Sequence, residues 1–183
     1  MKLLSHGLLA VSALALTTAF AEAKTFVYCS EASPEGFDPS PYTAGTTFDA
    51  SGHPIYNRLT EFKKGTTEVE PGLAESWEVS EDGMSITFTM RPGVTFHSGN
   101  PVRAEDAAWS LQRAVKLDKT PAFILTQFGF TADNVEEKIT FDDTTLTLTL
   151  DKPYAPTFVL NCLTANIASV VDKETVMANA QGD

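Results

Sequence analysis

The chain has 183 residues and a formal net charge of −11, because 24 Asp and Glu residues outnumber 13 Lys and Arg residues. This length is enough to bury a hydrophobic core and to fold as one domain. The acidity and the lack of clustered Lys and Arg argue against binding to nucleic acid or to an anionic lipid surface.

The first residues have the pattern of a secretory signal peptide. Lys2 precedes an apolar run from Leu8 to Phe20, and Ala21-Glu22-Ala23 places small residues at the −3 and −1 positions of a cleavage site. The apolar run is shorter than the roughly 20 residues that a membrane-spanning helix needs. We therefore predict a signal peptide over residues 1–23 and a mature chain that starts at Lys24 and is not inserted in a membrane.

The segment after the cleavage site is predicted to form a strand. Thr25–Ser30 reads TFVYCS, with apolar or aromatic side chains on both faces, which is typical of a central strand buried on both sides. Glu31–Pro41 contains several prolines and a glycine and is predicted to be an irregular loop. A helix is then predicted through His53, Ile55, Tyr56 and Leu59. Pro54 should lie in its first turn or kink it.

Cys29 and Cys162 are the two cysteines of the chain. An oxidising compartment would permit a disulfide between them. Cys29 falls in a predicted strand and Cys162 in a predicted apolar helix, so the sequence supports two buried free thiols at least as well as a disulfide. No CxxC motif is present, and nothing indicates redox catalysis.

The middle of the chain predicts two hairpins and a helix. Short strands at Leu59–Phe62 and Glu68–Glu70 flank a hairpin tip at Lys63-Lys64-Gly65. In Pro71–Arg113, apolar residues alternate with polar ones on either side of a turn at Glu81-Asp82-Gly83, as expected of antiparallel strands. The alternating residues are Trp77 and Val79, then Met84, Ile86, Phe88 and Met90. A helix should follow with an apolar stripe of Ala104, Ala107, Ala108, Leu111 and Val115.

The last third repeats these patterns. A second hairpin is predicted from Lys138–Phe141 and Leu146–Asp151, with its turn at Asp142-Asp143. An apolar helix through residues 158–163 should have Pro156 in its first turn, and Asp172 can cap a last helix that runs to Ala180. The predicted fold class is therefore mixed, α+β or α/β.

The order of residues in the middle of the chain resembles one protein family. The segments GLAESWEVSEDG, RPGVTFHSG and AEDAAWSLQR follow one another between Gly72 and Arg113. They are similar to the family 5 extracytoplasmic solute-binding proteins, which feed peptide ABC importers. The resemblance implies a periplasmic binding protein of the type II fold. Family members are much longer and have a second lobe, so residues 24–183 are expected to be the N-terminal part of the first lobe, in a chain that is truncated.

Arg103 departs from this family pattern. The family usually carries a small hydroxyl residue there as the N-cap of the helix. Because an arginine side chain cannot accept hydrogen bonds from the N–H groups of the first turn, we expect a weaker start to this helix.

A narrower resemblance is carried by the first third of the chain. YCSEASPEGFDP, TAGTTFDAS and HPIYNRLTEFKKGTTEV look like the dipeptide-binding members of the family. The resemblance implies that Thr43, Ala44 and Gly45 line the ligand cleft and that their backbone pairs with a bound peptide, like an added strand. A small loop that contains glycine allows such close approach. Without the resemblance, the same residues would be interpreted as a surface loop whose threonines cap the next helix.

The function expected from the resemblance is binding of dipeptides or short peptides in the periplasm and delivery to an inner-membrane ABC permease, by a monomer. The alternatives are a relative that binds longer peptides, haem or nickel, a non-functional fragment, and a secreted hydrolase. The hydrolase is disfavoured because no GxSxG, HExxH, P-loop or GxGxxG motif is present, so no enzyme is expected. His53 and His97 have no metal-ligand spacing, and no cofactor or metal is expected. The partners that hold the peptide's charged ends should lie outside this chain.

Overall fold

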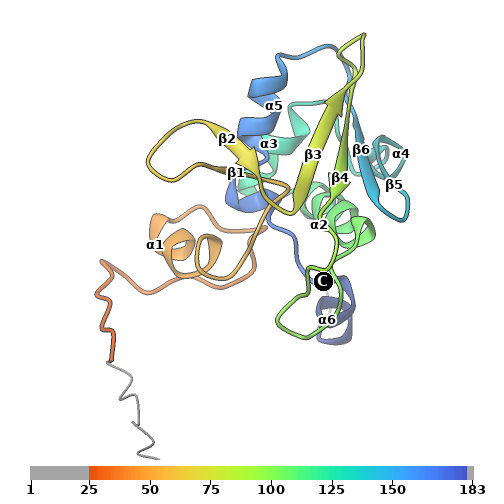
Figure 1. Ribbon diagram of the computed structural model, residues 1–183. Coiled ribbons are helices and arrows are strands. Elements are labelled where there is room, and N and C mark those ends of the chain that lie inside the picture. The colour runs from red at the N-terminus through yellow and green to blue at the C-terminus, as the bar shows by residue number, and fades with distance from the viewer. Residues whose placement is uncertain (1–24, 181–183) are drawn as a thin grey trace, which may run out of the picture.

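The computed structural model of the protein describes residues 25–180 (Figure 1). A four-stranded antiparallel sheet runs in the order β3-β4-β6-β5. Its strands are β3 Ala74–Val79, β4 Ser85–Met90, β5 Ile139–Phe141 and β6 Thr145–Thr149. β3 with β4 and β5 with β6 form the two hairpins that the alternating patterns predicted, and the pairing of β4 with β6 joins them. The mixed α and β class is confirmed.

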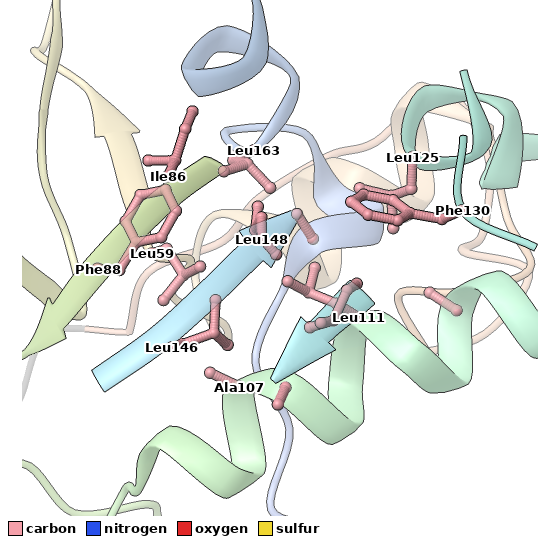
Figure 2. Close-up of a cluster of buried hydrophobic side chains, with 14 of the residues drawn as sticks. Leu59, Ile86, Phe88, Ala107, Leu111, Leu125, Phe130, Leu146, Leu148 and Leu163 are labelled. Carbon is pink, nitrogen blue, oxygen red and sulfur yellow. The ribbon is translucent and has the colours of Figure 1, made fainter. Parts of the chain in front are cut away.

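Helix α2, Ala104–Leu117, packs on this sheet. Its buried positions include the predicted stripe, and four of them are alanines: Ala104, Ala107, Ala108 and Ala114. Small side chains let a helix lie close to its neighbour, because the separation of packed elements depends on the side chains between them. Figure 2 shows Ala107 and Leu111 of α2 beneath Leu146 and Leu148 of β6. The contacts of α2 are with strands β5 and β6, and its buried residues join those of the sheet in one core cluster.

A second, two-stranded sheet lies beside the first. Its strands are β1 Thr60–Phe62 and β2 Val69–Pro71, which pair antiparallel as predicted. Gly65 adopts a φ of 76° in the connecting turn, a conformation that glycine adopts without steric cost. Gly72 follows β2 at a tight spot, since a Cβ atom there would lie 2.5 Å from the backbone oxygen of Arg58.

Four shorter helices follow α2 in the chain. They are α3 Phe123–Thr126, α4 Val135–Lys138, α5 Pro156–Cys162 and α6 Lys173–Ala178. Pro156 opens α5, and Asp172 caps α6 by accepting a hydrogen bond from the N–H of Thr175. Both features were predicted from the sequence.

Arg103 occupies the N-cap position of α2, where a weaker helix start is predicted. The Arg103 side chain makes no capping hydrogen bond. The carboxylate of Asp106 instead accepts from the Arg103 N–H at 3.0 Å. The first turn is thus stabilised by a carboxylate near the positive end of the helix dipole rather than by the residue at the cap.

The prediction of a buried central strand at Thr25–Ser30 is wrong for this chain. The segment has no regular structure, and Phe26, Val27 and Tyr28 are 86%, 76% and 62% exposed. Figure 1 shows it extending away from both sheets. A strand needs a neighbour for its N–H and C=O groups, and no strand among residues 25–180 pairs with this segment.

The predicted helix through His53 and Leu59 is also misplaced. The helical residues lie earlier, in α1 Gly45–Thr47 and in a π-helical turn over Phe48–Gly52. Pro54 has no N–H with which to continue the helical hydrogen bonds. Leu59 instead lies directly before β1, and its carbonyl accepts from the N–H groups of Gly72 and Ala74 at 3.0 and 3.2 Å.

The two cysteines are free thiols, so the disulfide alternative is not realised. Cys29 is exposed, which contradicts the expectation that both thiols are buried, and Cys162 is half-buried. Burial raises the pKa of the Cys162 thiol. The predicted signal peptide lies outside the described residues. Within them, no helix has both the length and the apolar character that crossing a bilayer requires.

Asp172 links the start of α6 to the turn at Ser98–Asn100 by hydrogen bonds. Its Oδ2 accepts from the side chains of Ser98, Asn100 and Thr175 at 2.6, 3.0 and 2.6 Å. Burial alone would raise the pKa of Asp172, but these donors lower it to about 2. Asp172→Ala should reduce the free energy of unfolding by about 1–3 kcal/mol at pH 7, measured by urea denaturation.

The same residue predicts a pH dependence with a definite sign. The folded pKa lies below the usual value of 3.8, so this stabilisation is present above about pH 4 and is lost as the pH falls towards 2. Asp172→Asn should flatten this part of the stability profile. Asp133→Asn, at an exposed residue, is the control and should leave the profile unchanged. Equal profiles for Asp172→Asn and the original chain would contradict the assignment.

Candidate ligand-binding loop

Thr43, Ala44 and Gly45 lie together where the chain enters α1. Thr43 and Gly45 are exposed, and Ala44 has extended backbone angles. The Ala44 carbonyl is occupied, because it accepts from the N–H groups of Thr47 and Phe48 at 3.0 and 3.2 Å. The N–H and C=O of Thr43 have no hydrogen-bond partner among residues 25–180. Main-chain groups of this loop are therefore available to an extended ligand.

Gly45 contributes space rather than an unusual backbone angle. It is absent from the glycines with positive φ among the described residues, so a left-handed conformation does not explain a glycine here. A Cβ atom built on Gly45 meets no atom within 4 Å. The surface over Gly45 is open, and a ligand can approach the backbone there.

The loop is ordered by small polar side chains behind it. Thr47 is fully buried, and its Oγ1 accepts from the N–H of Glu35 at 3.0 Å. Ser51, also buried, donates through Oγ to the carbonyl of Thr47 at 2.7 Å. Thr47 and Ser51, which have no role assigned from the sequence, thus fix the helical turns that follow the loop.

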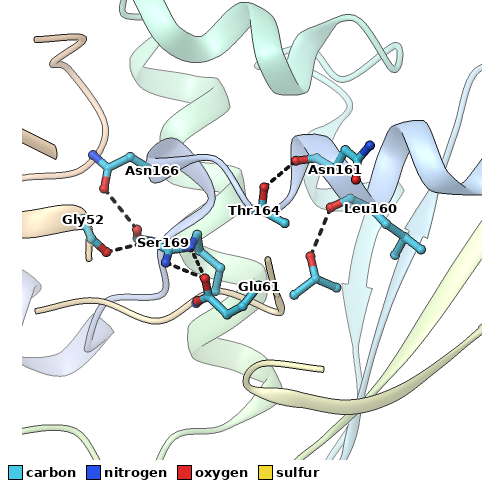
Figure 3. Close-up of polar contacts among 9 residues, drawn as sticks. Gly52, Glu61, Leu160, Asn161, Thr164, Asn166 and Ser169 are labelled. Carbon is cyan, nitrogen blue, oxygen red and sulfur yellow. Dashed lines mark hydrogen bonds and ion pairs between the residues drawn. The ribbon is translucent and has the colours of Figure 1, made fainter. Parts of the chain in front are cut away.

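A buried arginine holds the end of these turns. Arg58 is 4% exposed and donates through Nη1 to the carbonyl of Gly52 at 2.7 Å. Its other guanidinium nitrogens, Nε and Nη2, donate to Glu61 Oε2 at 3.0 and 2.6 Å. Figure 3 shows Gly52, Glu61 and Asn166 gathered in this region. A buried charge is costly unless it is paired, so the Arg58 guanidinium is kept in place by Glu61. The hydrogen bond from Arg58 then fixes the position of the Gly52 carbonyl.

The other end of the loop is held to α2. Arg113 donates through Nη1 and Nη2 to the two carboxylate oxygens of Asp38, at 3.0 and 2.6 Å. Burial by itself raises the pKa of Asp38, but the Arg113 guanidinium and the Ser40 N–H outweigh it and bring that pKa below its usual value. Sequence reasoning missed this pair. The Ser40 N–H that donates to Asp38 marks a local turn, but nothing in the sequence connects it to α2.

His53 and His97 line different hollows. His53 lines a hollow of about 550 Å³ beside α1, with Phe26, Tyr28, Thr46 and Asp49 among the other lining residues. His97 lines a different hollow of about 250 Å³ with Ile55, Tyr56, Val94 and Asp172. Within residues 25–180 there is no group of three or more His, Cys, Asp or Glu side chains that could hold a metal ion.

The glycines of this region predict contrasting stabilities. Because a side chain at Gly45 meets open space, Gly45→Val should change the free energy of unfolding by less than about 0.5 kcal/mol. Gly72→Ala should be clearly destabilising, because its Cβ would meet backbone at 2.5 Å. Thermal unfolding of both variants tests this. A large loss of stability in Gly45→Val would mean that the loop is packed rather than open.

Comparison with curated proteins gives several peptide-binding relatives. The chain is 44% identical over 180 residues to the dipeptide-binding protein of Escherichia coli strain K12, covering 91% of this chain and 33% of that protein. It is 44% identical over 167 residues to di/tripeptide-binding protein 4 of Pseudomonas aeruginosa strain UCBPP-PA14, covering 84% and 31%. It is also 42% identical over 156 residues to heme-binding protein A of Haemophilus influenzae, covering 74% and 28%. The chain thus spans about a third of the length of these relatives.

Solved structures share the fold. The murein tripeptide binding protein MppA of Escherichia coli matches with a TM-score of 0.69 at 28% identity, over 81% of this chain and 30% of that one. HbpA2 from Haemophilus parasuis matches with a TM-score of 0.62 at 34% identity, over 80% and 32%. The sequence model of the bacterial extracellular solute-binding proteins, family 5 Middle, matches residues 68–182. The chain belongs to the family 5 bacterial extracellular solute-binding proteins.

Proposed function

We propose that this chain is the N-terminal part of the first lobe of a periplasmic binding protein for dipeptides or short peptides. The observation that carries the proposal is the unpaired N–H and C=O of Thr43 beside the open surface over Gly45, on a loop held at both ends, in a member of a solute-binding family. Similarity to the dipeptide-binding protein of Escherichia coli over 91% of the chain supports the ligand class. Residues 24–183 would be this part of the lobe.

The proposed mechanism is recognition of the peptide main chain. An extended peptide has N–H and C=O groups that can pair with those of Thr43, in the manner of an added strand. Such contacts do not read side chains, so one site can accept many sequences. The charged ends of a dipeptide need partners of opposite charge in a closed cleft. We assign these partners to a second lobe outside residues 25–180, so the loop is one wall of the site.

The remaining parts of the proposal follow from this role. Residues 1–23 would direct export and be removed, and the mature protein would work in the periplasm as a monomer. It would deliver its ligand to an inner-membrane ABC permease. No catalytic step is proposed, because members of the family are binding proteins.

A second candidate ligand is haem. The similarity to heme-binding protein A of Haemophilus influenzae, at 42% identity, is nearly as high as the similarity to the dipeptide-binding relatives. We favour peptides, because the feature of the loop is unpaired backbone, which suits a peptide main chain better than a flat apolar ring.

A chimera tests the proposal. Residues 25–180 would replace the aligned stretch of the dipeptide-binding protein of Escherichia coli, which supplies the rest of the cleft. Calorimetry with alanyl-alanine should show binding, and a parallel titration with haemin should show none. The 183-residue chain by itself should bind neither ligand with micromolar affinity, because it would lack one wall of the cleft. A chimera that folds and binds only haemin would overturn the preference for peptides.

Within the chimera, Gly45→Val should weaken dipeptide affinity at least about tenfold. The valine side chain would occupy the open space through which the peptide approaches, and each lost main-chain hydrogen bond costs roughly 1 kcal/mol, where about 1.4 kcal/mol corresponds to a factor of ten. Thr43→Ser is the matched control and should be nearly silent, because a backbone contact does not depend on the methyl group. Unchanged affinity in a normally folded Gly45→Val variant would exclude this loop from the site.

Export is tested separately. The motif Ala21-Glu22-Ala23 predicts cleavage before Lys24. N-terminal sequencing of the protein recovered from the periplasm of an expressing cell should begin at Lys24. Recovery of the chain with Met1 intact would refute both the signal peptide and the proposed location.

A further inference from the structure

One side chain of α2 reaches the segment that leads into the candidate loop. Arg113 lies 75 positions from Asp38 in sequence, yet its guanidinium contacts both carboxylate oxygens of that residue. The same Nη1 donates to Ser40 Oγ at 3.0 Å. The guanidinium carbon also lies 5.9 Å from the centre of the Trp109 ring, within range of a cation–π contact.

This arrangement fixes the direction as well as the position of the segment. A planar guanidinium that forms two parallel hydrogen bonds to a carboxylate defines the orientation of both groups. Ser40 is almost fully buried, and its N–H also donates to Asp38 Oδ1 at 3.0 Å. A second link comes from Asn166, whose Nδ2 donates to the Pro39 carbonyl at 3.5 Å, at the long end of the range for a hydrogen bond. Arg113 is therefore a principal anchor of Asp38–Ser40.

The anchor lies close enough to the loop to control it. Ser40 precedes Thr43 by three residues, a stretch that spans at most about 10 Å when fully extended. Binding sites require their groups to be held within roughly 0.5 Å of the productive geometry. A shift of Asp38–Ser40 by more than this amount would be passed on to the Thr43 backbone.

We propose that Arg113 is a positioning residue for the Thr43–Gly45 loop, acting through Asp38 and Ser40. Its effect on ligand affinity rests on the proposed function, whereas its effect on the order of the loop does not. Lysine is not equivalent, because a single ammonium group cannot form the paired contact with the carboxylate. The ion pair Lys116–Glu136 provides a control, since it involves the same helix and a partner away from the loop.

Hydrogen exchange on the 183-residue chain tests the order of the loop directly. In Arg113→Met, the amides of Ser40, Thr47 and Phe48 should exchange at least about tenfold faster, and in Arg113→Lys by an intermediate factor. The amides of β4 should exchange at their original rates, and Lys116→Met should change neither group. Unchanged exchange at Ser40 and Thr47 in Arg113→Met would overturn the proposal. An equal increase throughout β4 would do so as well, because it would indicate a general loss of stability.

Affinity in the chimera supplies the second readout. Arg113→Met should weaken dipeptide binding at least about tenfold, and Arg113→Lys should restore part of the loss. Gly45→Val should weaken dipeptide affinity by a smaller factor in the Arg113→Met background than in the original chain. Both substitutions act through one loop, so their effects on affinity are not additive. A chimera that binds dipeptide equally well with Arg113→Met would overturn the positioning role. A chimera that binds no dipeptide at all would refute the proposed function, and the exchange data would still decide the role of Arg113.

Discussion

The packing of α2 against strands β5 and β6 is the interaction on which the rest of the structure depends. It buries the inner side chains of both strands, including Ile139, Leu146 and Leu148, almost completely. Apolar burial of this kind stabilises by roughly 25 cal/mol per Å². The alanines of α2 bring the helix close to the sheet, and this closeness fixes the rotation of the helix about its axis. Trp109 and Arg113 are consequently held on the part of α2 that the sheet does not cover.

The candidate loop gains its order from contacts made elsewhere. Its own side chains are small, and its exposed residues, Thr43 and Gly45, contribute little packing. Two arginines on either side of the loop hold it in place instead. Arg58 donates to the carbonyl of Gly52, and Arg113 donates to the carboxylate of Asp38. A loop organised in this way loses little further freedom when a ligand arrives, which favours affinity. It also leaves the loop free of bulky side chains where a peptide backbone would lie.

The parts of the fold that the sequence predicted are those determined by neighbours close in the chain. Ile86 and Phe88 alternate with polar residues because one face of β4 is buried, and Asp172 caps a helix through the residue three positions on. The failures have distant causes. Leu59 fits a helical spacing, but its carbonyl pairs with the segment after β2. TFVYCS has the composition of a central strand, but composition does not show whether another strand lies beside it to pair with its backbone.

The candidate site divides in the same way. The resemblance pointed to Thr43, Ala44 and Gly45 as candidate site residues. They lie together in the structure because they are consecutive in the chain. Arg113 and Asp38 were not identified, since a salt bridge across 75 positions leaves no local pattern in one sequence. Gly45 illustrates a finer limit. A glycine in a loop indicates either a positive φ or a need for space, and the structure is required to decide which of these applies.

The pairing of β4 with β6 has a consequence for how the sheet assembles. Each hairpin closes through a short turn, whereas the hydroxyls of Thr87 and Thr147, which lie 3.0 Å apart across the β4–β6 boundary, are 60 positions apart in sequence. Because the entropic cost of closing a loop increases with its length, the hairpins can form on a timescale of about microseconds, before the two halves meet. The segment that carries α2 lies inside the long loop. Pairing of β4 with β6 therefore closes a loop that contains the helix, and it joins the β5–β6 hairpin, on which α2 packs, to the β3–β4 hairpin.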